Sequence, residues 1–266
     1  MATPGKSSDM TATETPSGAK RRIEWQVAQL REVVVETARV RSLLLHVDGW
    51  RGHAPGQHVD IRLTAEDGYQ AQRSYSIASP REDEIIALTV ERVEDGEVSQ
   101  YLVEELRRGD RFELRGPIGG YFVWTVAVGG PLCLIAGGSG IAPLMAMLRH
   151  RDRRKSREPA VLLYSAASLE DVIYRQELDA MADGDPNLRV FTPLTRRQPE
   201  GWTGYRRRID KSMLAETCFA PDRSPKIYVC GPTPFVEDVS RFLVELGHDP
   251  ATIKTERFGP TGGQTQ

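Results

Sequence analysis

The chain carries the sequence LCLIAGGSGIAPL at residues 132–144, which joins an apolar run to a glycine-rich turn and a proline. The apolar run predicts a buried strand, and Pro143 sets the backbone for the first turn of a helix over residues 144–150. A glycine-rich turn between a strand and a helix offers backbone N–H groups to an anion. The stretch therefore predicts an α/β fold with a dinucleotide pyrophosphate held at Gly138, Ser139, Gly140 and Pro143. By itself it is also consistent with a tight turn that binds nothing, because Pro143 stands where the GxGxxG fingerprint has its last glycine.

The sequence that follows alternates apolar runs with amphipathic stretches. The apolar runs are 132–136, 160–164 and 226–230. Each is followed by an amphipathic stretch, at 144–150, 174–181 and 235–246 respectively. Alternation of this kind predicts βαβ units and a parallel sheet covered by helices. The basic run from Arg149 to Arg157 is interpreted as the solvated end of a helix and its loop, with a docking surface for a partner as the alternative.

The sequence before residue 128 has a different pattern, of short β-rich segments separated by turn residues such as Asp48-Gly49 and Asp67-Gly68. The segments are 27–35, 41–47, 58–63, 74–77, 85–93 and 111–114. Their spacing predicts a small antiparallel barrel, interrupted by one helix over 99–106 with Ser99 as its N-cap. The expected divisions are a disordered tail at 1–22, a barrel domain at 23–128, an α/β domain at 129–258 and an extension at 259–266.

Composition narrows the class of protein and its partners. The 266 residues have a formal net charge of −2 and mixed signs of charge, so we expect neither nucleic acid nor an anionic membrane as a partner. No run approaches the roughly 18 apolar residues that cross a bilayer, and the Ser- and Pro-rich start has no apolar core for a signal peptide. We therefore expect a cytoplasmic protein.

The barrel half contains Arg73-Ser74-Tyr75-Ser76, a set of side chains suited to a flavin dinucleotide. A guanidinium can neutralise a pyrophosphate, a phenol ring can lie against an aromatic cofactor, and a hydroxyl can hydrogen-bond the cofactor's edge. On a strand, residues 73 and 75 share one face, so a kink or strand end is needed for Ser76 to reach the same ligand. The alternative is an ordinary barrel strand.

Cys230-Gly231-Pro232 ends a third strand, and the three motifs in this order resemble the ferredoxin–NADP reductase superfamily, in particular its bacterial oxygenase-reductase branch, over residues 23–258. The resemblance implies an FAD-binding barrel followed by a Rossmann-like NAD(P)-binding domain. It implies that Arg73 contacts the pyrophosphate, Tyr75 packs on the flavin and Ser76 lies near its reactive nitrogen. Further flavin contacts are implied for Val90 and for the turn that contains Gly96, Val98 and Ser99. Glu97 departs from the pattern, because a second glycine is expected there.

The same resemblance implies roles for residues around the nicotinamide. Cys230 would lie against the ring, with Gly231 and Pro232 beside it, while Glu256 would supply a proton or position polar groups and Phe258 would cover the far face of the flavin. Ser76, Cys230 and Glu256 are thus the expected catalytic residues. Cys230 need not be a nucleophile, since the hydride passes directly between the two rings.

Five arginines follow a strand in Thr195-Arg196-Arg197 and Tyr205-Arg206-Arg207-Arg208, where cations could meet a ribose 2′-phosphate. The resemblance implies this role for Thr195, Arg196 and Arg208. Ala167 departs from the pattern, because a further arginine is often found there. We expect NADPH as the hydride donor, with NADH as the alternative.

The three cysteines, Cys133, Cys218 and Cys230, are dispersed and make neither a disulfide framework nor a CxxC pair, so no metal site is expected. A plant-type two-iron cluster takes four cysteines, so an iron–sulfur centre served by this protein would lie on another chain. The expected function is an FAD-dependent reductase that passes electrons to a separate ferredoxin, oxygenase component, haem or molybdenum protein. A non-catalytic flavin- or dinucleotide-binding redox sensor and a free flavin or iron-chelate reductase remain the alternatives.

Overall fold

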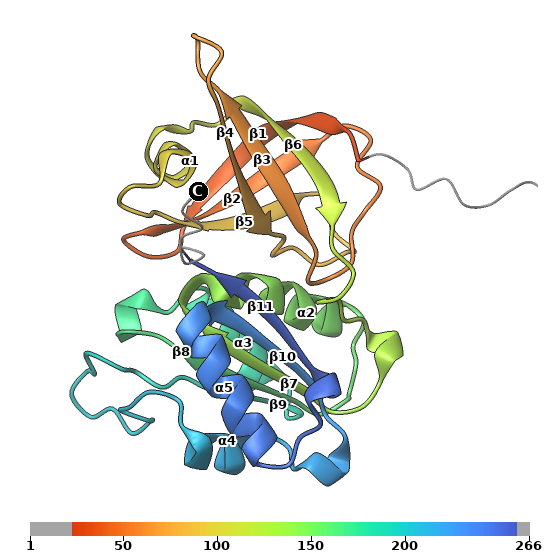
Figure 1. The fold of residues 1–266 in the computed structure, drawn as a ribbon, viewed down its shortest axis with the longest axis vertical. Coiled ribbons are helices and arrows are strands. Elements are labelled where there is room, and N and C mark those ends of the chain that lie inside the picture. The colour runs from red at the N-terminus through yellow and green to blue at the C-terminus, as the bar shows by residue number, and fades with distance from the viewer. Residues whose placement is uncertain (1–22, 260–266) are drawn as a thin grey trace, which may run out of the picture.

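The computed structural model describes residues 23–259, which form a barrel stacked on an α/β unit (Figure 1). The tail predicted at 1–22 and residues 260–266 of the predicted extension lie outside the described residues. Within the described part, no helix is both long and apolar enough to cross a membrane.

The first unit is a six-stranded antiparallel sheet with the strand order β4-β3-β6-β1-β2-β5. Its strands are β1 (Trp25–Val35), β2 (Val40–Val47), β3 (His58–Thr64), β4 (Gln70–Ser76), β5 (Ile86–Glu91) and β6 (Arg111–Ile118). The edge strands meet at one end, where Ile77 pairs with Leu88 and the Ala78 N–H donates to the Ala87 carbonyl at 2.8 Å. The predicted antiparallel barrel is confirmed.

Strand β2 shows how this unit is joined to the next. Side chains alternate across a strand, and Leu43 and Leu45 enter the barrel core. Leu44, between them, packs instead against a core shared with the α/β unit. Val40 and Leu44 are apolar residues on the outer face of β2, where the second unit covers them.

The second unit is a five-stranded parallel sheet with the order β11-β10-β7-β8-β9. Its strands are β7 (Leu132–Gly137), β8 (Ala160–Ser165), β9 (Leu188–Phe191), β10 (Lys226–Pro232) and β11 (Ile253–Phe258). The central strand β7 is buried along its whole length, as a parallel strand covered on both faces must be. This confirms the predicted α/β class.

Helices cover both faces of the parallel sheet. Helices α2 (Ile141–Arg153) and α3 (Arg175–Gly184) pack with Leu134 of β7 on one face. Helices α4 (Lys211–Thr217) and α5 (Thr233–Glu245) pack with Ile135 on the other. Helix α2 and strand β11 lie next to the barrel (Figure 1), so the carboxyl edge of the sheet faces the first unit. The predicted domain boundary near residue 128, between β6 and β7, stays a prediction.

Candidate active site

The glycine turn after β7 is a short 3₁₀ turn, η3 (Gly138–Gly140), that leads directly into α2. A Cβ atom added at Gly140 would lie 2.3 Å from the Cys230 carbonyl oxygen, so this position accepts only glycine. Gly138 has φ +56°, and a Cβ there would meet nothing within 4 Å. The turn is thus pressed against β10 on one side and open on the other, which is what a closely approaching phosphate requires.

Cys230 and Glu256 are register partners on β10 and β11. Cys230 is 2% exposed, and its burial, together with Glu256, raises the pKa of the thiol well above its usual value. Burial also raises the pKa of Glu256 to about 7. Its Oε2 atom is buried and has no hydrogen-bond partner within residues 23–259. The site therefore presents an uncommitted, proton-holding carboxyl beside a neutral thiol.

The three carboxyl ends that carry these residues are adjacent in the sheet, since β7, β10 and β11 are neighbours. Gly231 and Pro232 end β10, and Phe258, which is the register partner of Pro232, packs against the core shared with the barrel. The glycine turn contacts both β11 and the barrel strand β5. The structure thus gathers the predicted nicotinamide residues at the barrel interface.

Strand β4 carries the predicted flavin residues. Tyr75 packs against the barrel core, and burial raises the pKa of its phenol to about 12. Arg73 is exposed and donates to the Gln72 carbonyl at 2.7 Å. Ser74 lies on the opposite face, where it donates to Asp60 at 2.6 Å. Ser76 is the last residue of the strand, which is the strand-end geometry that the sequence required for it to approach the same ligand.

The turn before the barrel helix differs from prediction at Ser99. Helix α1 (Glu97–Gln100) begins after Gly96 and continues into a π-helical turn, η1 (Tyr101–Glu105). Ser99 is therefore inside the helix and is not its N-cap. Its hydroxyl donates to the Gly96 carbonyl at 3.0 Å and accepts from the Val93 N–H at 3.1 Å, so it closes the turn.

Glu97, the residue that departs from the family pattern, accepts a hydrogen bond of 3.0 Å from the hydroxyl of Tyr69. Tyr69 is 57% exposed on the β3–β4 hairpin. Its pKa is raised overall, chiefly by the hydrogen bond to Glu97, and nearby Arg73 acts in the opposite direction. The carboxylate thus has a partner of its own beside the predicted pyrophosphate arginine. Tyr69 carries no motif, so sequence reasoning missed it. Val98 and Val90 are buried in the barrel core, which leaves only their backbone for a ligand.

The predicted 2′-phosphate residues lie in loops at the carboxyl edge. Thr195 donates to the Ala166 carbonyl at 3.2 Å, and the Arg196 N–H donates to the Ala167 carbonyl at 2.9 Å. Of the five arginines, Arg197 pairs with Glu170 and Arg207 with Asp210, whereas Arg206 donates to the Trp202 carbonyl. Arg196 and Arg208 are exposed and have no carboxylate within 4.0 Å in the described part of the chain. Arg196 and Arg208, the two arginines selected from the sequence, are therefore available to an anion, as is Arg206 apart from its one carbonyl contact.

The interpretation of Arg149 to Arg157 as a solvated helix end is wrong for its first residues. The side chain of Arg151 is 3% exposed and pairs with Asp185. That of Arg149 is 19% exposed and pairs with Glu177 at 2.6 Å. Both arginines face protein because this end of α2 packs against α3 and the barrel.

Comparison with known proteins identifies both units. The family model of the oxidoreductase FAD-binding domain matches residues 25–123, and that of the oxidoreductase NAD-binding domain matches residues 134–241. The glycine betaine monooxygenase reductase subunit of Pseudomonas aeruginosa is 35% identical over 210 residues, which cover 78% of this chain and 56% of that protein. NADH-cytochrome b5 reductase 1 of Mortierella alpina is 30% identical over 80% of this chain and 71% of its own length.

Solved structures show the same arrangement. The FAD/NAD-binding domain of nitric oxide dioxygenase from Vibrio cholerae has a TM-score of 0.79 and 25% identity, covering 90% of this chain and all of that one. A cytochrome P450 reductase from Amycolatopsis has a TM-score of 0.78 and 25% identity, covering 92% of this chain and 74% of that one.

The chain belongs to the ferredoxin–NADP reductase superfamily. Its two units correspond to the FAD-binding and NAD-binding domains of oxidoreductases in that superfamily. The chain spans little more than half the length, 56%, of the glycine betaine monooxygenase reductase subunits that it matches.

Proposed function

We propose that the protein takes a hydride from NADPH, with NADH as the alternative, and delivers the electrons to a separate redox protein. The observation that carries the proposal is the uncommitted carboxyl of Glu256 beside Cys230, at a sheet edge that faces the barrel. Buried polar groups are normally paired, so an unpaired one at this edge is expected to meet a ligand.

The residues present fit both cofactors. The open side of Gly138 admits a pyrophosphate, and the exposed guanidinium of Arg73 can neutralise the phosphates of FAD while Tyr75 supports the ring. Bound FAD accepts a hydride and releases its electrons singly. Ser76 would hold the reactive edge of the ring in place, and Glu256, with a pKa of about 7, can keep or lose a proton at neutral pH. The neutral thiol of Cys230 would act by lying against the nicotinamide ring.

Arg196 and Arg208 support NADPH over NADH, because each is a guanidinium without a carboxylate partner within residues 23–259. A 2′-phosphate would supply that partner. Thr195 lies beside them in the same loop. Ala167 stands where the family often has a further arginine, so this surface has one cation fewer and NADH stays as the alternative.

The acceptor is proposed to be a separate protein that carries an iron–sulfur or haem centre. Relatives are named reductase subunit of a glycine betaine monooxygenase and NADH-cytochrome b5 reductase, and a structural neighbour is a cytochrome P450 reductase. The 266 residues contain three cysteines, one fewer than a four-cysteine cluster takes. The three thiols are free, which favours a reducing, cytoplasmic location.

The alternatives keep specific tests. A redox sensor needs cofactor binding without the hydride-transfer edge, and the neutral Cys230–Glu256 pair argues against that reading. A free flavin or iron-chelate reductase would release FAD during gel filtration. The proposal is tested by mixing FAD-loaded protein anaerobically with NADPH and with NADH and following the flavin absorbance. Bleaching of the flavin band by NADPH or by NADH supports the proposal. A flavin band that neither cofactor bleaches would favour the redox sensor instead.

A further inference from the structure

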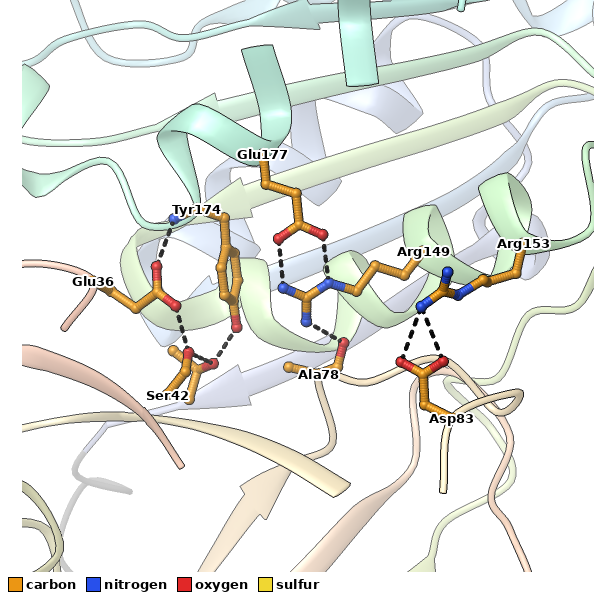
Figure 2. A network of polar contacts seen from close by, with 9 residues as sticks. Glu36, Ser42, Ala78, Asp83, Arg149, Arg153, Tyr174 and Glu177 are labelled. Carbon is orange, nitrogen blue, oxygen red and sulfur yellow. Dashed lines mark hydrogen bonds and ion pairs between the residues drawn. The ribbon is translucent and has the colours of Figure 1, made fainter. Parts of the chain in front are cut away.

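Arg149 of α2 contacts three groups at once, two in its own domain and one across the domain interface (Figure 2). Its Nη1 donates to the carbonyl of Ala78 in the barrel at 2.9 Å. Its Nε and Nη2 donate to the two carboxylate oxygens of Glu177 at 2.8 and 2.6 Å. The guanidinium also lies over the ring of Tyr174, 4.7 Å from its centroid. All three nitrogens of this half-buried cation therefore donate a hydrogen bond.

Tyr174 reaches the barrel from the start of α3 and is 5% exposed. Its hydroxyl hydrogen-bonds Thr89 of β5, and its backbone N–H donates to Glu36 at 3.2 Å. Glu36 accepts from Ser42 at 2.6 Å, and Ser42 shares a hydrogen bond of 3.0 Å with Thr89 (Figure 2). We call Glu36, Ser42, Ala78, Thr89, Arg149, Tyr174 and Glu177 the interdomain clamp.

Tyr174 adopts φ +59° and ψ +24°, in the left-handed region that side chains other than glycine rarely adopt. Such a conformation costs free energy and persists when the surroundings hold it. Here it is held at both ends, by Glu36 at the backbone and by Thr89 at the hydroxyl. The strained residue is thus the point at which the NAD(P)-binding domain is fastened to β5.

The clamp is attached next to each predicted cofactor segment. Ala78 is two residues beyond Ser76, and Thr89 precedes Val90. Arg149 lies on the helix that begins directly after the Gly138–Gly140 turn. A movement of one domain against the other would therefore shift the flavin strands and the dinucleotide turn together with the clamp.

The interface beside the clamp combines a shared apolar core with an open space. A cavity of about 500 Å³ lies there, lined in part by Glu36, Ser42, Arg149 and Glu177. Breaking the Arg149–Glu177 pair would leave a partly buried charge without a partner, which is costly. At this side of the interface the polar contacts of the clamp join the two domains beside the apolar core that they share.

We propose that Arg149 is a positioning residue for hydride transfer: by joining Ala78, Glu177 and Tyr174 it sets the separation between the flavin and nicotinamide sites. The inference rests on the proposed ring-to-ring transfer. Such transfer needs reacting atoms about 3–3.5 Å apart, and a misplacement of about 1 Å can cost about a hundredfold in rate. Arg149 need not touch either cofactor to have this effect.

The test compares Arg149→Met with Arg153→Met. Arg153 also crosses the interface, to Asp83 at 3.2 Å, but it is 57% exposed, and exposed pairs contribute little. In anaerobic single-turnover mixing, Arg149→Met is expected to slow bleaching of the bound flavin about tenfold to a hundredfold, with unchanged half-saturation by NADPH. Arg153→Met should behave as wild type.

A second readout uses the protein without cofactors. Hydrogen exchange should speed up in Arg149→Met over residues 77–80 and 172–176, which the clamp fastens, and stay unchanged in Arg153→Met. Should Arg149→Met fail to fold, Tyr174→Phe removes one hydroxyl and is expected to slow bleaching about twofold to tenfold. If a folded clamp variant bleaches its flavin at the wild-type rate, the positioning role is wrong, whether or not hydrogen exchange is faster. If the flavin of the wild type does not bleach, the proposed function is wrong. In that case unchanged hydrogen exchange in Arg149→Met would show independently that Arg149 does not fasten the two segments.

Discussion

Cys230 and Glu256 stand opposite one another on β10 and β11, so that a buried thiol and a buried carboxyl share the sheet edge that faces the barrel. Burial favours the neutral form of both groups, and Glu256 raises the pKa of the Cys230 thiol further, because a carboxylate would repel a thiolate. At neutral pH the thiol therefore carries no charge, whereas the carboxyl, with a pKa of about 7, can hold or release a proton.

Replacing Glu256 by Gln should change how stability depends on pH. The pKa of Glu256 is about 7 in the folded protein, against an ordinary value of 4.5. The unfolded chain thus loses this proton first, so the wild type loses stability as pH rises from about 4.5 to 7, by on the order of 3 kcal/mol in all. Urea unfolding of the cofactor-free proteins should show Glu256→Gln gaining on the wild type across this range. If the free energies of unfolding of the two proteins change with pH in parallel, the pKa of Glu256 is not raised.

Replacing Arg73 by Ala should weaken FAD. The guanidinium lies exposed in the middle of β4, and a charge-assisted contact contributes about 1.5–3 kcal/mol, so the FAD dissociation constant should rise roughly tenfold to a hundredfold. Fluorescence titration measures it, with Arg31→Ala, an exposed arginine of β1, as the matched control. Equal affinity in both variants would exclude Arg73 from the pyrophosphate site.

Replacing Arg196 by Ala should weaken NADPH and leave NADH nearly unaffected, because only NADPH carries the 2′-phosphate. The loss of one guanidinium–phosphate contact predicts a roughly tenfold to hundredfold higher half-saturating concentration of NADPH. Arg197→Ala is the control, since Arg197 already pairs with Glu170. If both cofactors weaken equally, Arg196 serves the shared pyrophosphate, and preferred bleaching of the wild type by NADH would make Ala167 the better predictor.

Replacing Gly140 by Ala should destabilise the NAD(P)-binding domain. The new Cβ would meet the Cys230 carbonyl at 2.3 Å, and the contact is with backbone that a rotamer change cannot relieve. Overpacking of this kind costs about 1–3 kcal/mol, measurable by thermal unfolding. Gly184→Ala, where a Cβ meets nothing within 4 Å, should lose no stability. A Gly140→Ala protein as stable as wild type would mean that the turn does not press on β10.

The fold class could be predicted because its signals are local: short β-rich segments separated by turn residues in the barrel, and continuous apolar runs in β7, β8 and β10. Strand β11 was missed because its sequence, IKTERF, contains three charged residues and no apolar run. Strand β9 has only four residues, and helix α4 seven, too few for a clear period.

The site could be predicted in part for the same reason. The glycine turn and Cys230-Gly231-Pro232 are short motifs, and the structure places them in contact. Arg149 and Tyr174 bind partners 71 and 138 residues away in the sequence, Ala78 and Glu36, so no window reveals them. The same limit explains why Arg149 was interpreted as solvated, since its charge is visible in the sequence and its enclosure is not.

The barrel seam between β4 and β5 links the cofactor to the lifetime of the protein. The two edge strands are joined near Ile77 and Leu88, and the predicted flavin residues Tyr75 and Val90 stand on either side of the opening. A ligand that binds only the folded chain stabilises it by an amount that grows with the logarithm of its concentration. Apoprotein in a flavin-starved cell should therefore open at this seam first and be degraded faster, so that flavin supply sets how much enzyme survives.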